Sequence, residues 1–410
     1  MSRPLSNLLR AAIAVGAWSA LLGRGPAAQG YDLSALLLGA RLLEVGRADA
    51  LYDHDPEWFN RTGPAARSAA RETGFPGEPT PYLQAPLFAV LARPLASRPF
   101  PQVLEWWNAA GAAALVTGAF LSALWALRRP PRPLEWLAIM GVLVVSEPGP
   151  YALWLGQTTP FVFALTAGAL CVSGRGALAG ALLVPPAFLK LVPSVVAAAW
   201  AGTRRWVAVL SFAGGLAAVA LVSLAVAGVP VHRAYLSRLR DVSSLAPAAY
   251  NNQSLAAALE RRQRPEPEVW LWRRSRPSPS TRVAVAIAAL LGTAAVVHRA
   301  SRARDHREQV LQAGALLGML LVPGISWSHY FVFLIPAGIA AAAAARQNGW
   351  SAIGIGAAIV VAGALVTRPF FPDQVVPRGG IVDGAFVSAL VILALLLAPR
   401  RERGVTTPAA

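Results

Sequence analysis

Charge is scarce in this chain. Only 14% of its 410 residues are charged, whereas soluble domains carry about 25% charged residues. All of the 37 basic residues are arginines except one, Lys190. Cysteine is scarcer still, because Cys171 stands alone and excludes a disulfide within the chain. The low charge argues against a soluble domain.

Sequence motifs that mark common catalytic folds are also missing. The chain has no Walker loop, no Rossmann glycine fingerprint, no zinc motif and no Gly-x-Ser-x-Gly elbow. These absences argue against an ATP-driven pump and against a nucleotide-sugar enzyme with a soluble catalytic domain. We assign no cofactor and no metal ligand from the sequence, which leaves metal dependence open.

Long apolar runs dominate what is present. Hydrophobic residues make up 55% of the chain, and its mean hydropathy is +0.49. A helix that crosses a bilayer needs roughly 20 apolar residues. We predict an all-α polytopic membrane protein with about twelve spans, at 8–23, 102–127, 134–149, 157–173, 177–189, 192–203, 206–228, 282–298, 309–324, 329–345, 350–367 and 383–399. The fifth and sixth are short and are expected to form a helical pair broken at 190–193.

The arginines indicate how the chain is oriented. The net charge of +17 does not indicate nucleic-acid binding, because the arginines lie at the ends of the apolar runs. If the N-terminus is cytoplasmic, every connection on that side is basic, as the positive-inside rule requires. Examples are Arg128-Arg129, Arg204-Arg205 and Arg400 to Arg403. This orientation places both termini in the cytoplasm. The first apolar run could be a cleaved signal peptide, but the many later spans favour an uncleaved first span.

Two long segments then lie outside the membrane. The first long segment, 24–101, opens with an amphipathic stretch over 31–45. It ends in an apolar helix that begins near Tyr82–Phe88, is too short to span and is predicted to lie in the interface. The second long segment, 229–281, ends in a Pro/Arg-rich stretch at 261–282 that is predicted to be flexible.

Three ionisable residues at this outer boundary are candidates for chemistry. Asp32 follows the first span and could take a proton from a sugar hydroxyl, or it could simply be a first-turn acid of the next helix. Lys190 lies at the broken pair and could hold a lipid phosphate, or it could be a lysine that reaches to the interface. His329 begins a later span and could hydrogen-bond or protonate a departing phosphate, or it could be an interfacial polar residue.

Other polar residues of the same side are weaker candidates. Asp53, His54 and Asp55 have the character of metal ligands, but their spacing is also ordinary turn chemistry. Gln157, Gln253 and Trp327 are candidates for contacts with a substrate. Asn252-Gln253-Ser254 fits a glycosylation sequon, yet loop structure or an acceptor contact is the preferred interpretation.

Several short motifs follow one another along the chain. They are Asp32, Leu51-Tyr52-Asp53, Tyr82 to Phe88, Trp106-Trp107-Asn108, Gly156-Gln157, Gly180 to Pro193, Asn252 to Leu255 and Ser326 to Tyr330. Their order resembles glycosyltransferase family 87. The resemblance covers nearly the whole chain and depends on order, because each motif is weak by itself. Departures are Tyr82-Leu83-Gln84-Ala85-Pro86 in place of Tyr-x-Tyr-Pro-Pro, and one histidine where many relatives have two.

The resemblance implies a fold, a reaction and partners. The fold would be a single membrane-embedded GT-C domain over 1–410. The donor would be a polyprenyl-phosphate sugar, most simply mannose, and the acceptor a lipid-linked or cell-envelope glycan at the outer face of the plasma membrane. Asp32 would be the catalytic base, and Lys190 and His329 would lie near the donor phosphate. Asp53, Gln157, Gln253 and Trp327 would contact donor or acceptor.

Two other classes of protein remain open at this level. A transporter or lipid flippase would also have many spans and a broken helix, but it predicts inverted repeats, and no repeat is found. A non-catalytic subunit of envelope assembly has no need for Asp32, Lys190 and His329 together.

Overall fold

The described residues of the computed structural model are almost entirely helical. They are 3–23, 29–72, 79–264, 271–303, 306–365 and 383–399, and within these ranges only isolated β-bridges accompany the helices. The predicted all-α class is thus confirmed. The basic run Arg400 to Arg403 lies outside the described residues.

A helix lies at each of the twelve predicted spans. The boundaries differ by a few residues, and the predicted span 134–149 is interrupted, because α7 ends at an extended Ser146 and a separate short helix follows, α8 (Pro148–Trp154). The helices at the predicted spans are α1 (Arg3–Gly23), α6 (Phe100–Leu127), α7 (Pro133–Val145), α9 (Thr159–Cys171), α10 (Ala177–Leu189), η3 (Val192–Ser194) with α11 (Val195–Gly202), α12 (Trp206–Ala227), α16 (Pro279–Arg302), α17 (Arg307–Leu321), η5 (Ser328–Phe333) with α18 (Leu334–Gln347), α19 (Ala352–Leu365) and α20 (Gly384–Leu397).

In the described part of the chain, five helices are long and apolar enough to cross a membrane by themselves. Several shorter apolar helices of 10–17 residues accompany them. The chain is therefore a multi-pass membrane protein. The five are Pro4–Gly23, Phe100–Leu127, Trp206–Ala227, Pro279–Arg302 and Ser328–Gln347.

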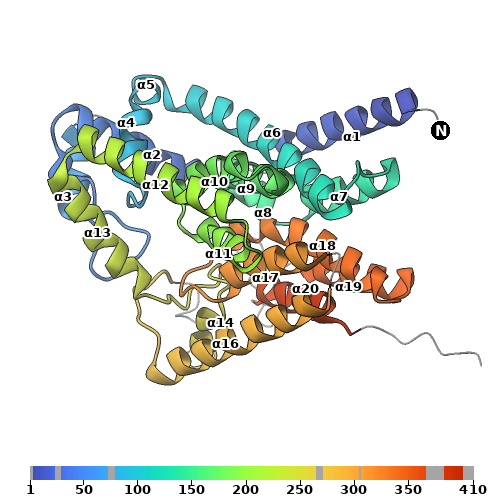
Figure 1. Ribbon diagram of the computed structural model, residues 1–410. Helices are drawn as coiled ribbons and strands as arrows, with labels where there is room; N and C mark the ends of the chain where they lie inside the picture. The colour runs from blue at the N-terminus through green and yellow to red at the C-terminus, as the bar shows by residue number, and fades with distance from the viewer. Residues whose placement is uncertain are drawn as a thin grey trace, which may run out of the picture.

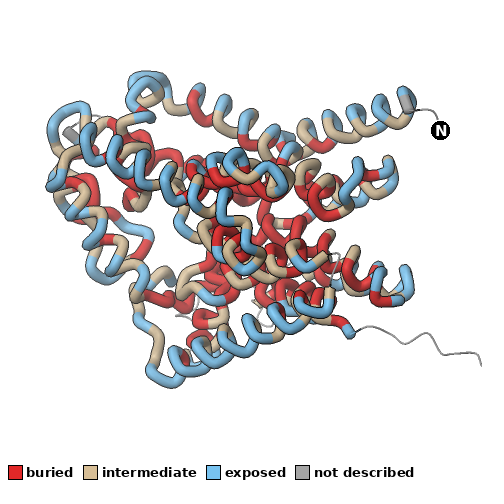
Figure 2. Tube along the Cα trace, in the orientation of Figure 1, coloured by how far each residue is buried: buried red, intermediate tan, exposed pale blue. Residues whose placement is uncertain are grey.

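Two of these helices expose apolar side chains along their length. Leu210 and Leu221 of α12 are 69% and 66% exposed, and Leu290 of α16 is 71% exposed. Figure 2 shows pale and tan tube along α12 and α16, with the buried residues gathered between them. Such surfaces would be unfavourable in water, but they match the acyl chains of a bilayer.

The interior is held by close helix packing between small residues. A side chain at Gly118 of α6 would meet the Phe163 ring of α9 at 2.6 Å. A side chain at Gly180 of α10 would collide with the backbone of α12 at Ala208. Small residues that let helix backbones approach are typical of membrane bundles, where packing replaces the hydrophobic effect between helices.

The predicted break at Lys190 is present. Pro185 and Pro186 lie in the last turns of α10, and Lys190 is extended, with φ −146° and ψ 116°. A 3₁₀ turn, η3, then leads directly into α11. Proline removes backbone donors near the end of a helix and so helps to end it. The lysine side chain thus leaves the chain between two short helices.

The long segments gather at one end of the bundle. Figure 1 shows the first long segment and α13 there, whereas the N-terminus of α1 lies at the opposite end. The helices of these segments are α2 (Tyr31–Glu44), η1 (Ala48–Ala50), α3 (Pro64–Glu72), α4 (Pro86–Leu91), α5 (Arg93–Ala96), α13 (Val229–Ser243) and α14 (Leu255–Arg261).

Two local expectations for these segments need correction. The stretch 31–45 is not an amphipathic helix with a single buried face, because α2 is buried without interruption from Leu33 to Ala40. The stretch 261–282 is largely anchored where it is described, since Arg261 donates to the Ala249 and Asn252 carbonyls and pairs with Asp383. Its residues 265–270 lie outside the described part of the chain.

Candidate functional site

The start of α2 is fixed against the end of α8. The Gly30 and Asp32 amides donate to the carbonyls of Trp154 and Leu155 at 3.0 and 2.9 Å. Gly156 has φ +67°, and a side chain there would meet the Leu33 Cβ at 2.8 Å. Glycine is needed at this position because L-residues with side chains rarely adopt that conformation and have no room here. These contacts bring Asp32 beside Gln157.

Gln157 links the carboxylate of Asp32 to the amine of Lys190. Its Nε2 donates to Asp32 Oδ2 at 2.6 Å, and its Oε1 accepts from Lys190 Nζ at 2.9 Å. Lys190 Nζ also donates to Thr159 Oγ1 at 2.9 Å. No ion pair joins Asp32 directly to Lys190, both of which the structure describes. The amide therefore stands between the two opposite charges.

His329 and Tyr330 enclose the other side of the lysine. Lys190 Nζ lies 3.5 Å from His329 Nε2 and 4.1 Å from the centre of the Tyr330 ring. The ammonium over the ring is a cation–π contact. Because the ammonium has no acceptor atom, Nε2 must be the acceptor, and the neutral ring then carries its proton on Nδ1. His329 is 2% exposed, so this Nδ1–H is buried.

Several buried polar atoms beside this network lack a partner in the described part of the chain. They are Thr158 Oγ1, Ser326 Oγ, Ser328 Oγ and His329 Nδ1. An unsatisfied buried polar atom costs about 1–3 kcal/mol. Four of them within two short stretches, next to Gln157 and around His329, fit a place where a polar ligand supplies the missing hydrogen bonds.

The environment tunes Asp32 toward base chemistry. Burial raises the pKa of Asp32 to about 6, although Lys190 and the Gln157 hydrogen bond act to lower it. A carboxylate of this kind is ionised at neutral pH, yet is a stronger base than an ordinary surface aspartate.

The segment that fits the glycosylation sequon, Asn252-Gln253-Ser254, has a structural role. Gln253 N donates to the Ser326 carbonyl at 2.7 Å, and Ser328 N donates to the Asn251 carbonyl at 2.8 Å. The Asn252 amide is fully buried and donates to two backbone carbonyls, so it is not displayed as a glycosylation acceptor. The side-chain oxygen of Gln253 accepts from Phe386 N at 3.2 Å. The segment thus positions the stretch that leads to His329.

Trp327 packs between segments that are distant in the chain. Its ring meets the Phe59 ring edge-on at 5.2 Å, and its backbone pairs with Asn252. It therefore touches the first long segment from beside His329. Its predicted contact with substrate stays a prediction, as does that of Gln253.

The three residues considered as metal ligands have separate partners. Asp53 Oδ2 accepts from the amides of Ala65 and Ala66 in the first turn of α3. Asp55 Oδ1 accepts from Glu57 N at 2.8 Å and Trp58 N at 3.0 Å, which is an ordinary turn. Within the described ranges, no group of three acidic, histidine or cysteine residues is placed to hold a metal. The predicted substrate contact of Asp53 stays a prediction.

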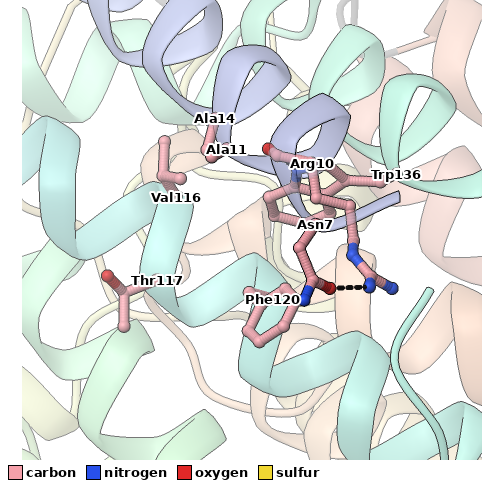
Figure 3. A pocket seen from close by; sticks show the side chains of 8 residues that line it. All are labelled: Asn7, Arg10, Ala11, Ala14, Val116, Thr117, Phe120 and Trp136. Carbon is pink, nitrogen blue, oxygen red and sulfur yellow. Dashed lines mark hydrogen bonds between the residues drawn. The ribbon is translucent and has the colours of Figure 1, made fainter. Parts of the chain in front are cut away.

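A cavity of about 370 Å³ lies elsewhere, between α1, α6 and α7 (Figure 3). It opens beside the N-terminal half of α1, whereas Asp32 follows the other end of that helix. Figure 3 shows Arg10 hydrogen-bonded to Asn7 at this cavity. Its lining is Asn7, Arg10, Ala11, Ala14, Val116, Thr117, Phe120 and Trp136. None of the predicted site residues takes part in it.

Sequence reasoning missed Thr159 and Tyr330 as contacts of Lys190. Thr159 lies two residues after Gln157, and Tyr330 follows His329 directly. The sequence alone does not show which neighbours of Gln157 and His329 turn toward the lysine. Only the turn at 156–159 and the 3₁₀ helix η5 decide that.

Two characterised proteins are similar to this chain in sequence. The protein is similar to a polyprenol-phosphate-mannose-dependent alpha-(1-2)-phosphatidylinositol pentamannoside mannosyltransferase of Mycolicibacterium smegmatis, with 28% identity over 324 residues, 78% of this chain and 70% of the relative. The protein of the same name from Mycobacterium tuberculosis is 28% identical over 280 residues, 64% of this chain and 58% of the relative.

A family model also matches the chain. The model describes glycosyltransferase family 87 and matches residues 82–323. This region includes Gln157 and Lys190, whereas Asp32 and His329 flank it. The match covers more than half of the chain, and the resemblance inferred from motif order is confirmed. The chain belongs to glycosyltransferase family 87.

Proposed function

We propose that this membrane glycosyltransferase transfers a hexosyl group, most simply mannosyl, from a polyprenyl-phosphate sugar to a lipid-linked or cell-envelope glycan. The observation that carries the proposal is the network of Asp32, Gln157, Lys190 and His329. It joins a carboxylate, an amide, an amine and an imidazole that come from four separate parts of the chain. Family membership favours this function over the transporter and flippase alternatives.

The proposed architecture is a single GT-C domain over 1–410 in which all twelve helices cross the membrane. The broken pair α10 and α11 would count as two short spans. Orientation follows the positive-inside rule, with both termini cytoplasmic and the site facing outward in the plasma membrane.

The reaction is a single in-line displacement. The acceptor hydroxyl oxygen forms a bond to the anomeric carbon while the bond from that carbon to the phosphate oxygen breaks. Asp32 takes the hydroxyl proton, and the polyprenyl phosphate leaves with the electron pair. One base and one displacement invert the anomeric configuration.

Lys190 and His329 act on the departing phosphate. The ammonium of Lys190 can exchange its contacts with Gln157 and Thr159 for phosphate oxygens, because all are hydrogen-bond acceptors. His329 Nδ1 and the hydroxyls of Ser326 and Ser328 are buried donors without partners in the described structure. Groups of this kind stabilise charge that develops on the leaving phosphate.

Gln157 keeps the base and the cation apart. If Lys190 hydrogen-bonded Asp32 directly, the ammonium would occupy the carboxylate lone pair that takes the proton of the acceptor hydroxyl. The ammonium itself would then be unavailable to phosphate. The amide satisfies both groups with one donor and one acceptor. We therefore assign Gln157 as a positioning residue rather than a simple substrate contact.

The proposed donor follows the relatives, whose names specify polyprenol-phosphate-mannose. The test is transfer from radiolabelled polyprenyl-phosphate mannose in membranes that contain the full-length protein, with mass spectrometry of the product. We expect a labelled lipid or glycan from the natural protein and none from Asp32→Asn at equal expression. No product from the natural protein, with a related mannosyltransferase active in parallel, would refute the mannosyl donor.

A further inference from the structure

A second polar cluster lies where the two long segments meet. Its centre is Arg238 on α13, whose side chain is 3% exposed. Arg238 Nη1 donates to Asp241 Oδ2 at 2.6 Å. Its Nε and Nη2 are buried and have no hydrogen-bond partner among the described residues. A buried guanidinium with two of three nitrogens unsatisfied is costly unless an anion or water completes it.

One carboxylate serves two guanidiniums in this cluster. Arg274 Nη2 donates to both oxygens of Asp241 at 2.6 Å. His54 Nε2 lies 3.6 Å from Asp241, while its Nδ1 donates to the Tyr52 carbonyl at 3.1 Å. Burial lowers the pKa of His54, and the arginines lower it further. With a neutral imidazole, two arginines and one aspartate leave a surplus of one positive charge.

In the proposed topology, the cluster lies near the level where the outer ends of the spans leave the membrane. Gly228 alone separates α13 from α12, and Figure 1 shows α13 turning away from α12 across the same end of the bundle as α3. Val229 and Leu236 of α13 are 47% and 49% exposed apolar side chains, as expected of a helix on a membrane surface. Lipid phosphates lie at this depth.

We propose that Arg238 and Arg274, held by Asp241, bind the phosphodiester of a lipid-linked acceptor. Planar guanidiniums bind phosphate oxygens in pairs, and a phosphodiester carries the single negative charge that the cluster lacks. The acceptor role rests on the proposed function, whereas the phosphodiester site does not.

The cluster has an accessible edge. The side chains of Asp241 and His54 are 28% and 29% exposed, and that of Arg274 is 10% exposed. A phosphate that arrives at this edge meets Arg274 first. It reaches Arg238 once the Asp241 carboxylate turns toward one guanidinium only. Asp241 therefore both orients the arginines and competes with the ligand.

A purely structural role predicts different behaviour. The two long segments are already joined here, because Phe59 N donates to the Trp272 carbonyl and Arg274 N donates to the Glu57 carbonyl, both at 2.7 Å. If the cluster were only a clasp between them, loss of either partner would destabilise the protein and leave anion affinity unchanged.

Direct binding tests the site without any transfer reaction. The full-length protein in nanodiscs of zwitterionic lipid is titrated with a soluble glycerophosphodiester and, separately, with inorganic phosphate. We expect Arg238→Gln to weaken phosphodiester binding roughly tenfold or more. Asp241→Asn should tighten it several-fold, because the competing charge is removed. Arg240→Gln, an exposed arginine of the same helix, is the matched control.

The outcomes separate the alternatives. Equal weakening by Arg238→Gln and Arg240→Gln would mean nonspecific attraction and would overturn the site. Unchanged binding in both Arg238→Gln and Asp241→Asn, with a lower melting temperature in each, would support the clasp instead. Tighter binding of inorganic phosphate than of the diester would overturn the diester assignment. Arg238→Lys retains the charge and covers the case in which Arg238→Gln does not fold.

Kinetics then test the acceptor role. With a phosphodiester-bearing acceptor, Arg238→Gln should raise KM roughly tenfold at nearly unchanged kcat. With a neutral alkyl glycoside that offers the same hydroxyl, KM should stay within about twofold of the natural protein. Equal effects on both acceptors would refute the acceptor role. If the natural protein transfers nothing, the binding experiment alone still decides the phosphodiester site.

Discussion

The molecule treats opposite charges differently in its two polar clusters. Asp32 and Lys190 are held apart by the amide of Gln157. Asp241 instead touches Arg238 and Arg274 directly at 2.6 Å. A separated pair leaves the carboxylate basic and the ammonium available, whereas a direct pair neutralises both groups. The separated charges belong to the proposed catalytic site, whereas the directly paired charges belong to the proposed phosphodiester-binding site.

The largest expected effect comes from removing the separated carboxylate. Asp32→Asn keeps the size of the side chain but cannot accept the hydroxyl proton. We expect transfer to fall by roughly 10²–10⁴-fold, the usual contribution of a general base. Initial rates in proteoliposomes provide the measurement, with thermal stability as the control for folding. Near-normal transfer would mean that the base is another group.

Removing the separated cation should have a somewhat smaller effect. Lys190→Ala deletes the charge that faces the donor phosphate, so donor affinity should fall roughly tenfold to a hundredfold. The measurement is binding of polyprenyl phosphate to the purified protein. Arg205→Ala is a matched control, because this arginine pairs with Glu308 far along the chain from the site. Unchanged donor affinity in Lys190→Ala would remove its phosphate role.

Removing the amide tests the separation itself. In Gln157→Ala, Lys190 is free to bond Asp32 directly, and the pair would then resemble that of Asp241 with its arginines. We expect a lower maximal rate, by roughly tenfold, because a neutralised carboxylate is a poorer base. A rate equal to that of the natural protein would show that separation is unimportant.

The pH profile distinguishes the same two arrangements. As the proposed base, Asp32 has to be deprotonated, and its pKa is raised to about 6, so the transfer rate should rise through about pH 6. Direct contact with an ammonium lowers a carboxyl pKa, so the inflection in Gln157→Ala should move to lower pH. The readout is kcat/KM measured from about pH 4.5 to about pH 8. An inflection that moves upward in the variant would contradict the spacer role.

The smallest effect concerns the backbone that brings Asp32 to Gln157. Gly156→Ala places a side chain at φ +67° and against Leu33. We expect a loss of stability of about 1–3 kcal/mol, with a corresponding loss of transfer as the turn shifts. Gly141→Ala is the control, since nothing lies within 4 Å of a side chain added there. Thermal unfolding in detergent compares the two variants.

Much of the architecture follows from local patterns. The twelve apolar runs predicted the helices, because a helix that faces lipid must satisfy its backbone internally whatever surrounds it. The Lys190 break was also predictable, since Pro185, Pro186 and Pro193 bracket a lone polar residue. The long segments were harder. Within the apparently amphipathic stretch at 31–45, the residues from Leu33 to Ala40 are buried on every side, and only the packing of α2 with α4 and α5 shows this.

The candidate site was likewise predictable in part from the sequence and in part only from the tertiary structure. Asp32, Lys190 and His329 were selected because ionisable residues are rare in such a chain, and rarity is a property of sequence. The proximity of these three side chains is a property of the fold instead, because it depends on the glycine turn at Gly156 and on the packing of α2 against α8. Likewise, composition alone did not single out Arg238 from the other arginines. Only the folded molecule shows that two nitrogens of Arg238 are buried without hydrogen-bond partners among the described residues.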